Sequence, residues 1–145
     1  MSDAVWFLKR CPLFERLSPS ECRRLETRSR IRSYRKGEVV YFPNEPGEHV
    51  LLLTRGRVKI VSRLPDGRES ILALIEPGEL FGELALFDAS PRNEQAETVN
   101  DCQVVAIPRK DILDVVDRRP EFALSILKFA TASPTRRPIA WCSRS

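Results

Sequence analysis

The sequence predicts a mainly β domain, a sandwich or barrel of short strands with helices at both ends of the strand region. From residue 30 onward, runs rich in Val, Ile, Leu and Tyr are separated by turn residues, a pattern typical of an all-β sandwich or barrel. Glycines punctuate these runs nine to eleven residues apart, at positions 37, 47, 56, 67 and 78. With 145 residues, 42% of them apolar and 30% charged, the chain has the size and composition of one soluble domain.

Two short helices are expected ahead of the strands, over about residues 3–10 and 19–26. The second has a marked start: Ser18 occupies the N-cap position, Pro19 lies in the first turn and Glu21 takes the third helical position. Serine and glutamate at this spacing satisfy each other's free backbone N–H groups in a capping box, and proline is favoured at the first helical position. We therefore expect the second helix to begin at Pro19.

The strand region divides into eight expected strands. They are Arg30–Tyr34, Val39–Phe42, His49–Arg55, Arg57–Arg63, Arg68–Ile75, Leu80–Phe81, Ala96–Val99 and Gln103–Ile107. The residues 64–67, with the sequence LPDG, are expected to join the fourth and fifth strands as a hairpin. Proline suits a turn position there, and Asp-Gly supplies the positive φ that a tight turn needs.

Two further helices are expected after the strands. The first covers residues 109–116 and carries Ile112, Leu113 and Val116 on one face. The second, the closing helix, covers about residues 120–133, since Pro120 opens it and Pro134 ends it. One face of the closing helix carries Phe122, Ile126 and Phe129, and Ala123, Leu127 and Ala130 lie beside it.

The charge is unevenly distributed along the chain. Residues 1–121 contain 20 basic and 20 acidic residues, whereas the last 24 residues contain four basic residues and no acid. The net charge of +4 therefore lies in the tail, which excludes a generally basic nucleic-acid-binding domain. Residues 134–145 are expected to form a basic, flexible tail because they contain two prolines and no periodicity.

The remaining composition argues against a membrane protein, a metal protein and an enzyme. There is no basic leader before an apolar run, and no apolar stretch approaches the roughly 20 residues that span a bilayer, so we expect a cytoplasmic protein. The cysteines, Cys11, Cys22, Cys102 and Cys142, form no CxxC pair and are expected to be free, buried thiols. With His49 as the one histidine and no matching motif, no nucleophile with a base is visible, and we predict no catalytic residues.

Two stretches carry a resemblance to a known family. The first is KGEVVYFPNEPG over residues 36–47 followed by VLLLTRG over residues 50–56, and the second is FGELAL over residues 81–86 followed after five residues by Arg92. In this order of elements they resemble the cyclic-nucleotide-binding domain, specifically the sensor half of Crp/Fnr-type bacterial transcription regulators. The resemblance implies a double-stranded β-helix (jelly roll) with flanking N- and C-terminal helices. It covers about residues 11–132, and we expect the sensor domain to occupy residues 1–132.

The second stretch resembles the phosphate-binding cassette of that family. The resemblance implies that Gly82 lets the backbone approach the ligand, that Glu83 accepts a hydrogen bond from the ribose 2′-hydroxyl, and that Arg92 pairs with the cyclic phosphate. It implies a small-molecule effector, and the sequence leaves open whether this is cAMP, cGMP or another ligand. The expected ligand-binding residues are Phe81, Gly82, Glu83, Leu84, Ala85, Arg92 and Asn93.

The residues after Arg92 depart from the family pattern. Nucleotide-binding members have a small hydroxyl residue and then alanine, whereas this chain has Asn93 and Glu94. Two like charges about 4 Å apart repel by roughly 4 kcal/mol at an effective dielectric of about 20, which is half of the roughly 8 kcal/mol of a micromolar ligand. An inward-pointing Glu94 would therefore weaken nucleotide binding. The alternative is that Glu83 and Arg92 form a structural ion pair in a vestigial cassette.

The closing helix bears on both the effector and the partners. Family members contact the base from residues about seventeen positions after the opening proline, and here that distance reaches Arg137 and Pro138, beyond Pro134. The resemblance also implies a homodimer through this helix. Since no helix-turn-helix follows in the sequence, we expect a sensor domain that lacks the DNA-binding half and does not bind DNA directly.

Two function classes remain open from the sequence. One is the ligand-sensing domain of a Crp/Fnr-type regulator, and the other is a stand-alone or vestigial sensor that acts through another protein. A basic stretch from Arg23 to Lys36 has seven basic residues against Glu26. We interpret it as the solvated faces of a helix and an edge strand, with a weak anion-contacting surface as the alternative.

Overall fold

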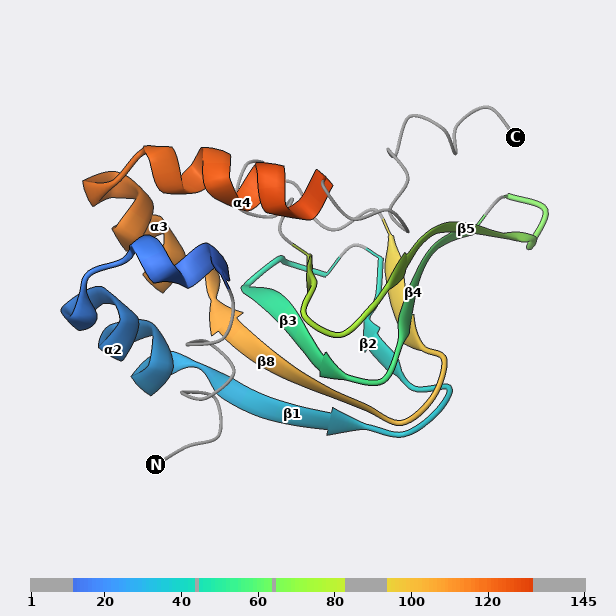
Figure 1. Cartoon of the computed structure of the whole chain (residues 1–145). Helices are drawn as coiled ribbons and strands as arrows, with labels where there is room; N and C mark the ends of the chain where they lie inside the picture. Colours follow the sequence, from blue (N-terminus) through green and yellow to red (C-terminus); the bar gives the residue numbers. More distant parts are fainter. Residues whose placement is uncertain (1–11, 44, 64, 83–93, 132–145) are drawn as a thin grey trace.

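Two four-stranded antiparallel sheets face each other in the computed structural model, and the helices cover the outer side of one of them (Figure 1). The structure describes residues 12–43, 45–63, 65–82 and 94–131. The first sheet has the strand order β1-β8-β3-β6 and the second has the order β2-β7-β4-β5. The elements are η1 (Pro12–Arg16), α2 (Pro19–Arg28), β1 (Arg30–Tyr34), β2 (Val39–Tyr41), β3 (His49–Arg55), β4 (Val58–Arg63), β5 (Glu69–Ile75), β6 (Leu80–Phe81), β7 (Gln95–Thr98), β8 (Cys102–Pro108), α3 (Arg109–Arg118) and α4 (Glu121–Thr131).

The helix α2 begins as its sequence predicts. The Ser18 hydroxyl accepts a hydrogen bond from the Glu21 N–H at 3.2 Å, and the Glu21 carboxylate accepts one from the Ser18 N–H at 2.9 Å. This capping box confirms the predicted helix, which continues past residue 26 to Arg28. The short 3₁₀ helix η1 was not predicted, and the helix expected over residues 3–10 lies outside the described residues.

The eight predicted strands are all present, with ends that differ from the prediction by at most one residue. The hairpin between β4 and β5 has Gly67 at a φ of 87°, and the Asp66 carboxylate accepts a hydrogen bond from the Arg68 N–H at 3.0 Å. Four of the five predicted turn glycines adopt the left-handed conformation, and Gly47 does not. Because the chain passes repeatedly from one sheet to the other, the strands form a closed roll, which confirms the mainly β prediction.

The strands β3 and β8 are buried on both faces, which explains why their sequences are unbroken apolar runs. In β3, Leu51 and Leu53 face the second sheet, whereas Val50 and Leu52 face the helices. All four side chains are at most 3% exposed. The first sheet is therefore the middle layer of a three-layer arrangement.

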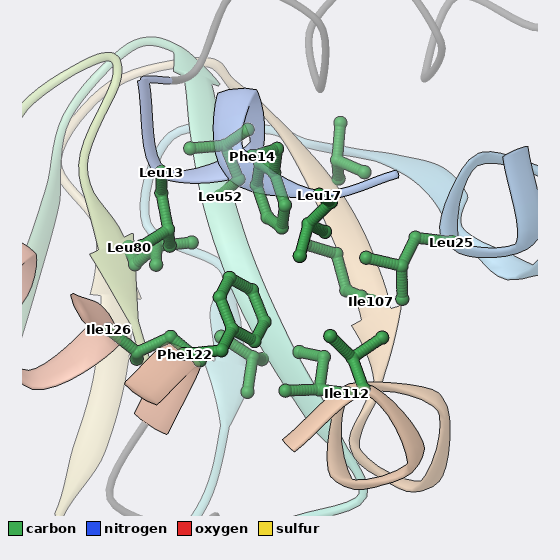
Figure 2. Packing of buried hydrophobic residues seen from close by; sticks show 13 residues of the cluster. Leu13, Phe14, Leu17, Leu25, Leu52, Leu80, Ile107, Ile112, Phe122 and Ile126 are labelled. Atoms are coloured by element: carbon green, nitrogen blue, oxygen red, sulfur yellow. The ribbon is translucent and has the colours of Figure 1, made fainter. Parts of the chain in front are cut away.

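Two hydrophobic clusters result, which we call the inner core and the outer core. The inner core lies between the sheets and comprises Tyr41, Leu51, Leu53, Val58, Ile60, Leu72, Ala73, Ile75, Phe81, Ala96, Cys102, Val104 and Ala106. The outer core lies between the first sheet and the helices (Figure 2), and comprises Leu13, Phe14, Leu17, Leu25, Val50, Leu52, Leu80, Val105, Ile107, Ile112, Val115, Phe122 and Ile126. The two residues of β6 belong to different cores, Leu80 to the outer and Phe81 to the inner.

The helices α3 and α4 both bury one face in the outer core. In α3 the buried apolar pair is Ile112 and Val115, so the predicted face was rotated: Leu113 and Val116 are only partly buried beside it. Ile112 and Val115 are three positions apart and so lie on one face of α3, and this face packs against the first sheet and α2. In α4, Phe122 and Ile126 are buried as predicted.

Candidate functional site

The predicted ligand-binding segment joins the two sheets, and the structure describes both of its ends. Phe81 ends β6 in the first sheet and Gly82 follows it, and Gln95 opens β7 in the second sheet. The other predicted ligand-binding residues, Glu83, Leu84, Ala85, Arg92 and Asn93, lie outside the described residues. Their roles, and the Glu83–Arg92 ion pair, remain predictions.

The first end of the segment is fixed by burial. Phe81 pairs with Leu51 of β3 and is fully buried in the inner core, while Leu80 pairs with Leu52 and is buried in the outer core. The next residue, Gly82, has a φ of 75°, in the left-handed region that strains residues with a Cβ. Glycine is thus required here by backbone conformation, in addition to the close approach that the family resemblance implied.

The second end is held on both sides, because β7 lies between β2 and β4. Ala96 faces the inner core opposite Ile60, and Glu97 faces outward opposite Lys59. The Lys59 ammonium forms ion pairs with Glu69 at 2.9 Å and with Glu97 at 3.4 Å. Its hydrogen bond to Glu69, followed by the Coulombic attraction of both carboxylates, raises the pKa of Lys59 against the opposing effect of burial.

Tyr41 connects the two ends, although no sequence motif marks it. Its ring stacks on Phe81 with the centroids 6.4 Å apart and the planes at 26°, and its backbone is registered with Ala96. The register of β2 and β7 shifts between Val39 and Tyr41, which indicates a β-bulge. Val39 is opposite the outward-facing Glu97, so without the bulge Tyr41 would also face outward. The run VVYF carries no alternation that could have signalled this reorientation.

The closing helix α4 has one buried and one exposed face. Phe122 packs against Phe14 of η1, with the ring centroids 6.1 Å apart and the planes at 54°, and Ile126 is buried beside them (Figure 2). Leu124 is 60% exposed. In the predicted dimer stripe, Ala123 is half-buried, and the side chains of Leu127 and Ala130 lie outside the described residues.

A charged cluster holds the junction between α3 and α4 against α2. The Arg119 guanidinium donates a hydrogen bond to the Glu21 carboxylate at 2.8 Å, although the two residues are 98 positions apart. Burial acts to raise the pKa of Glu21, but the hydrogen bonds from Ser18 and Arg119 prevail, and the pKa is lowered. Beside this pair, Arg24 of α2 contacts Asp111 at 3.4 Å and Asp114 at 2.5 Å, both on α3.

The basic stretch from Arg23 to Lys36 lies mainly on α2 and the edge strand β1, as predicted from the sequence. The strand β1 pairs only with β8 within the described part of the first sheet. Arg30 and Arg32 of β1 are exposed. Two members of the stretch form ion pairs with α3: Arg24 with Asp111 and Asp114, and Arg28 with Asp111 at 4.0 Å.

Family membership follows from comparison with known proteins. Residues 31–119 match the family model of the cyclic nucleotide-binding domain. The chain belongs to this family. It is 32% identical over 121 residues to the CRP-like cAMP-activated global transcriptional regulator of Mycobacterium tuberculosis, a match that covers 83% of this chain and 54% of that protein. The chain spans about half the length of the curated relatives it matches.

Solved structures agree with this assignment. The sensor domain of the transcriptional regulator DNR from Pseudomonas aeruginosa superposes with a TM-score of 0.77 at 29% identity, covering 84% of this chain and 82% of that one. The catabolite activator protein of Thermus thermophilus gives a TM-score of 0.69 at 32% identity, covering 83% of this chain and 56% of that one. The predicted jelly roll and the Crp/Fnr-type sensor domain are thereby confirmed.

The structure also places two of the cysteines and the histidine. Cys22 is half-buried and Cys102 is buried, both as free thiols, and burial is the main cause that raises the pKa of the Cys102 thiol. Cys11 and Cys142 lie outside the described residues, and His49 is the first residue of β3. Within residues 12–131, apart from the gaps noted above, no three His, Cys, Asp or Glu side chains are grouped to hold a metal ion. None of the helices in that same part of the chain is long and apolar enough to cross a bilayer.

Proposed function

We propose that this cyclic nucleotide-binding-type domain senses a cyclic nucleotide monophosphate, with cAMP or cGMP as the effector, and serves as the regulatory module of a Crp/Fnr-type transcription regulator. The observation that carries the proposal is the construction of both ends of the ligand-binding segment. Phe81 and the left-handed Gly82 begin it, and the twice-paired β7 receives it. The named activity of the Mycobacterium relative, activation by cAMP, supports the choice of effector.

In this proposal the anion is bound by the segment between the two ends. Arg92 pairs with the cyclic phosphate and Glu83 accepts a hydrogen bond from the ribose. Gly82 allows the backbone to turn toward the ligand. The contacts come from Phe81, Gly82, Glu83, Leu84, Ala85, Arg92 and Asn93.

Binding is communicated to the closing helix through β6. Phe81 lies in the inner core and the preceding Leu80 lies in the outer core, where α4 buries Phe122 and Ile126. A shift of β6 on effector binding therefore changes the surface on which α4 rests.

We further propose that α4 pairs with its copy in a homodimer, since Leu124 is 60% exposed on its outer face. Sedimentation at tens of micromolar protein should show the dimer, and a monomer there would contradict it.

The second candidate is a vestigial sensor that acts through a protein partner, and Glu94 favours it. Glu94 is half-buried and lies two residues before Ala96, which faces the inner core. The alternation of β7, continued by one step, directs Glu94 toward the same interior, where its carboxylate would repel a cyclic phosphate. In that case the domain folds and acts without a bound nucleotide.

Calorimetric titration with cAMP and cGMP distinguishes the two candidates. Tight binding by the wild type that is lost in Arg92→Leu supports the sensor of cyclic nucleotides. Binding that appears only in Glu94→Ala shows that Glu94 blocks the site, and supports the vestigial sensor. Absence of heat in the wild type and in both variants refutes cyclic-nucleotide sensing.

The remaining features of the proposal concern the module as a whole. It acts by binding and not by catalysis, as its relatives are regulators and binding domains. It works in the cytoplasm, where regulators of this type meet their effectors. The sensor unit comprises residues 1–132, and residues 134–145 form a basic tail that takes no part in effector binding.

A further inference from the structure

The two ends of the ligand-binding segment belong to different sheets. Among the described residues, no strand pairing joins β6 to β7. The strand β6 has two residues and, within the described part of the chain, lies at the edge of its sheet and pairs only with Leu51 and Leu52 of β3. The first end is thus held by one short pairing, whereas the second is held from both sides. Backbone hydrogen bonds between strands do not set the distance between the ends.

Tyr41 makes the connection that strand pairing does not. Through its backbone it is registered with Ala96 at the second end, and through its ring it stacks on Phe81 at the first end. Tyr41 is 6% exposed and Phe81 is fully buried, so the contact is shielded from water. The bulge after Val39 turns the ring toward Phe81, and bulges of this kind commonly redirect a side chain near a functional site.

We propose that Tyr41 is a positioning residue for the effector site: its ring fixes Phe81 relative to Ala96 and so sets the spacing of the two ends between which the cyclic nucleotide binds. This inference rests on the proposed function. A planar ring with two side-chain torsions holds its partner in a defined stacked geometry, whereas leucine fills similar space without defining an orientation. An aromatic pair changes an equilibrium by about threefold to tenfold beyond the burial of its area. Affinity for the effector should change by about that factor when the ring is lost.

The structure provides a matched control in the outer core. Phe14 and Phe122 form an aromatic pair at a similar centroid distance, 6.1 Å, and both belong to the outer core, whereas Tyr41 and Phe81 belong to the inner core. Phe14 is 4% exposed, close to the exposure of Tyr41. Tyr41→Leu and Phe14→Leu therefore remove comparable aromatic pairs, one at the proposed site and one away from it.

The test compares three full-length variants by cAMP titration calorimetry, with urea denaturation to compare their stabilities. Tyr41→Leu should bind cAMP about threefold to tenfold more weakly than the wild type. Phe14→Leu should bind within about twofold of the wild type, and so should Tyr41→Phe, because it retains the ring. An equal loss of affinity in Tyr41→Leu and Phe14→Leu would show that Tyr41 acts only through stability. A loss in Tyr41→Phe as large as in Tyr41→Leu would show that the hydroxyl, and not the stacked ring, is responsible; either result overturns the proposal.

Hydrogen exchange in the absence of nucleotide separates this inference from the proposed function. In Tyr41→Leu the amides of Gly82 and Gln95 should exchange faster than in Phe14→Leu, by about the same factor as the loss of affinity. If the wild type binds no cyclic nucleotide but this difference is seen, the proposed function fails and the positioning role stands. If the wild type binds cAMP and the two variants exchange alike at both ends, the function stands and the positioning role fails.

Discussion

The inner and outer cores share the same middle sheet but are built from different residues. The inner core includes three alanines, Ala73, Ala96 and Ala106, together with Cys102, whereas the buried residues of the outer core within the described part of the chain include no alanine, and Cys22 packs against them only partly buried. Facing sheets lie about 10 Å apart, so small residues are needed where large ones such as Tyr41 cross the gap. The helices, by contrast, meet the sheet through large aliphatic and aromatic side chains. The inner core thus holds Phe81 and Ala96, beside the two ends of the proposed ligand-binding segment, and the outer core holds the helices against the first sheet.

The largest effects are expected at two neighbouring residues of β3, Leu51 in the inner core and Leu52 in the outer core. Leu51→Ala and Leu52→Ala should each lower the free energy of unfolding by about 3 kcal/mol, because both side chains are at most 3% exposed. Their other effects should differ. Leu51 pairs with Phe81, so its variant should weaken cAMP binding, whereas Leu52 pairs with Leu80, so its variant should speed hydrogen exchange in α4. Identical patterns in the two variants would break the division.

The corner at Gly56 closes the inner core where the chain passes from β3 to β4. Gly56 has a φ of 88°, and a Cβ there would collide with the Asp101 carbonyl oxygen and lie 2.6 Å from the Cys102 sulfur. Gly56→Ala should therefore cost about 3 kcal/mol, from backbone strain and displacement of this corner together. Gly67→Ala is the control, since Gly67 has a similar φ of 87° with nothing within 4 Å of a Cβ. It should cost about 1 kcal/mol in urea denaturation. If Gly56→Ala and Gly67→Ala lower the free energy of unfolding equally, the neighbours of Gly56 move aside without a measurable loss of stability.

The charged cluster that holds the junction of α3 and α4 against α2 contains an acid-sensitive contact, the hydrogen bond from Arg119 to Glu21. Because the pKa of Glu21 is lowered from its ordinary value of 4.5, its contribution to stability is full above that pH and is lost as the pH falls through the lowered pKa. Glu21→Gln should cost about 1 kcal/mol at neutral pH and flatten the stability profile below about pH 4.5. Glu15→Gln, at an exposed position of η1, is the control and should leave the profile as it is. If Glu21→Gln loses as much stability in acid as the wild type does, other carboxylates cause the acid sensitivity.

A substitution on the outward face of the second sheet should have the smallest effect on the free energy of unfolding. Lys59→Met removes two ion pairs that are about 30% exposed or less, so the loss should be under about 1 kcal/mol at neutral pH. The pKa of Lys59 is raised, so its contribution is full below the ordinary value of 10.5 and is lost as the pH rises through the raised pKa. Urea denaturation at neutral and alkaline pH checks both points. A loss of several kcal/mol would mean that this face supports the inner core directly.

Most of the fold could be predicted because the signals are local. Glycines with a left-handed backbone and the capping box at Ser18 act within a few residues, and buried strands such as β3 show as apolar runs. Features that depend on distant partners could not be predicted. The bulge that turns Tyr41 inward depends on its register with β7, and Arg119 meets Glu21 from 98 positions away. Val115 was missed because the phase of a ten-residue helix is weakly defined by sequence alone.

The candidate site was predicted less completely than the fold. Motif resemblance named the segment that starts at Phe81 and Gly82, and the structure shows that these two residues begin a crossing between the sheets. Arg92 and the other residues beyond Gly82 in the motif remain predictions. Tyr41 carries no motif, since its role arises from a packing contact with Phe81 and a register with Ala96.

Hydrogen exchange of the wild-type chain with and without millimolar cAMP tests most directly whether effector binding at the inner core reaches the helices of the outer core. We predict slower exchange at Gly82 and Gln95, the two ends of the ligand-binding segment, together with a change in α4, transmitted through Leu80 and Phe81. Protection at the two ends without any change in α4 would contradict the coupling of the two cores. Exchange that is the same throughout the chain with and without cAMP would contradict the account as a whole.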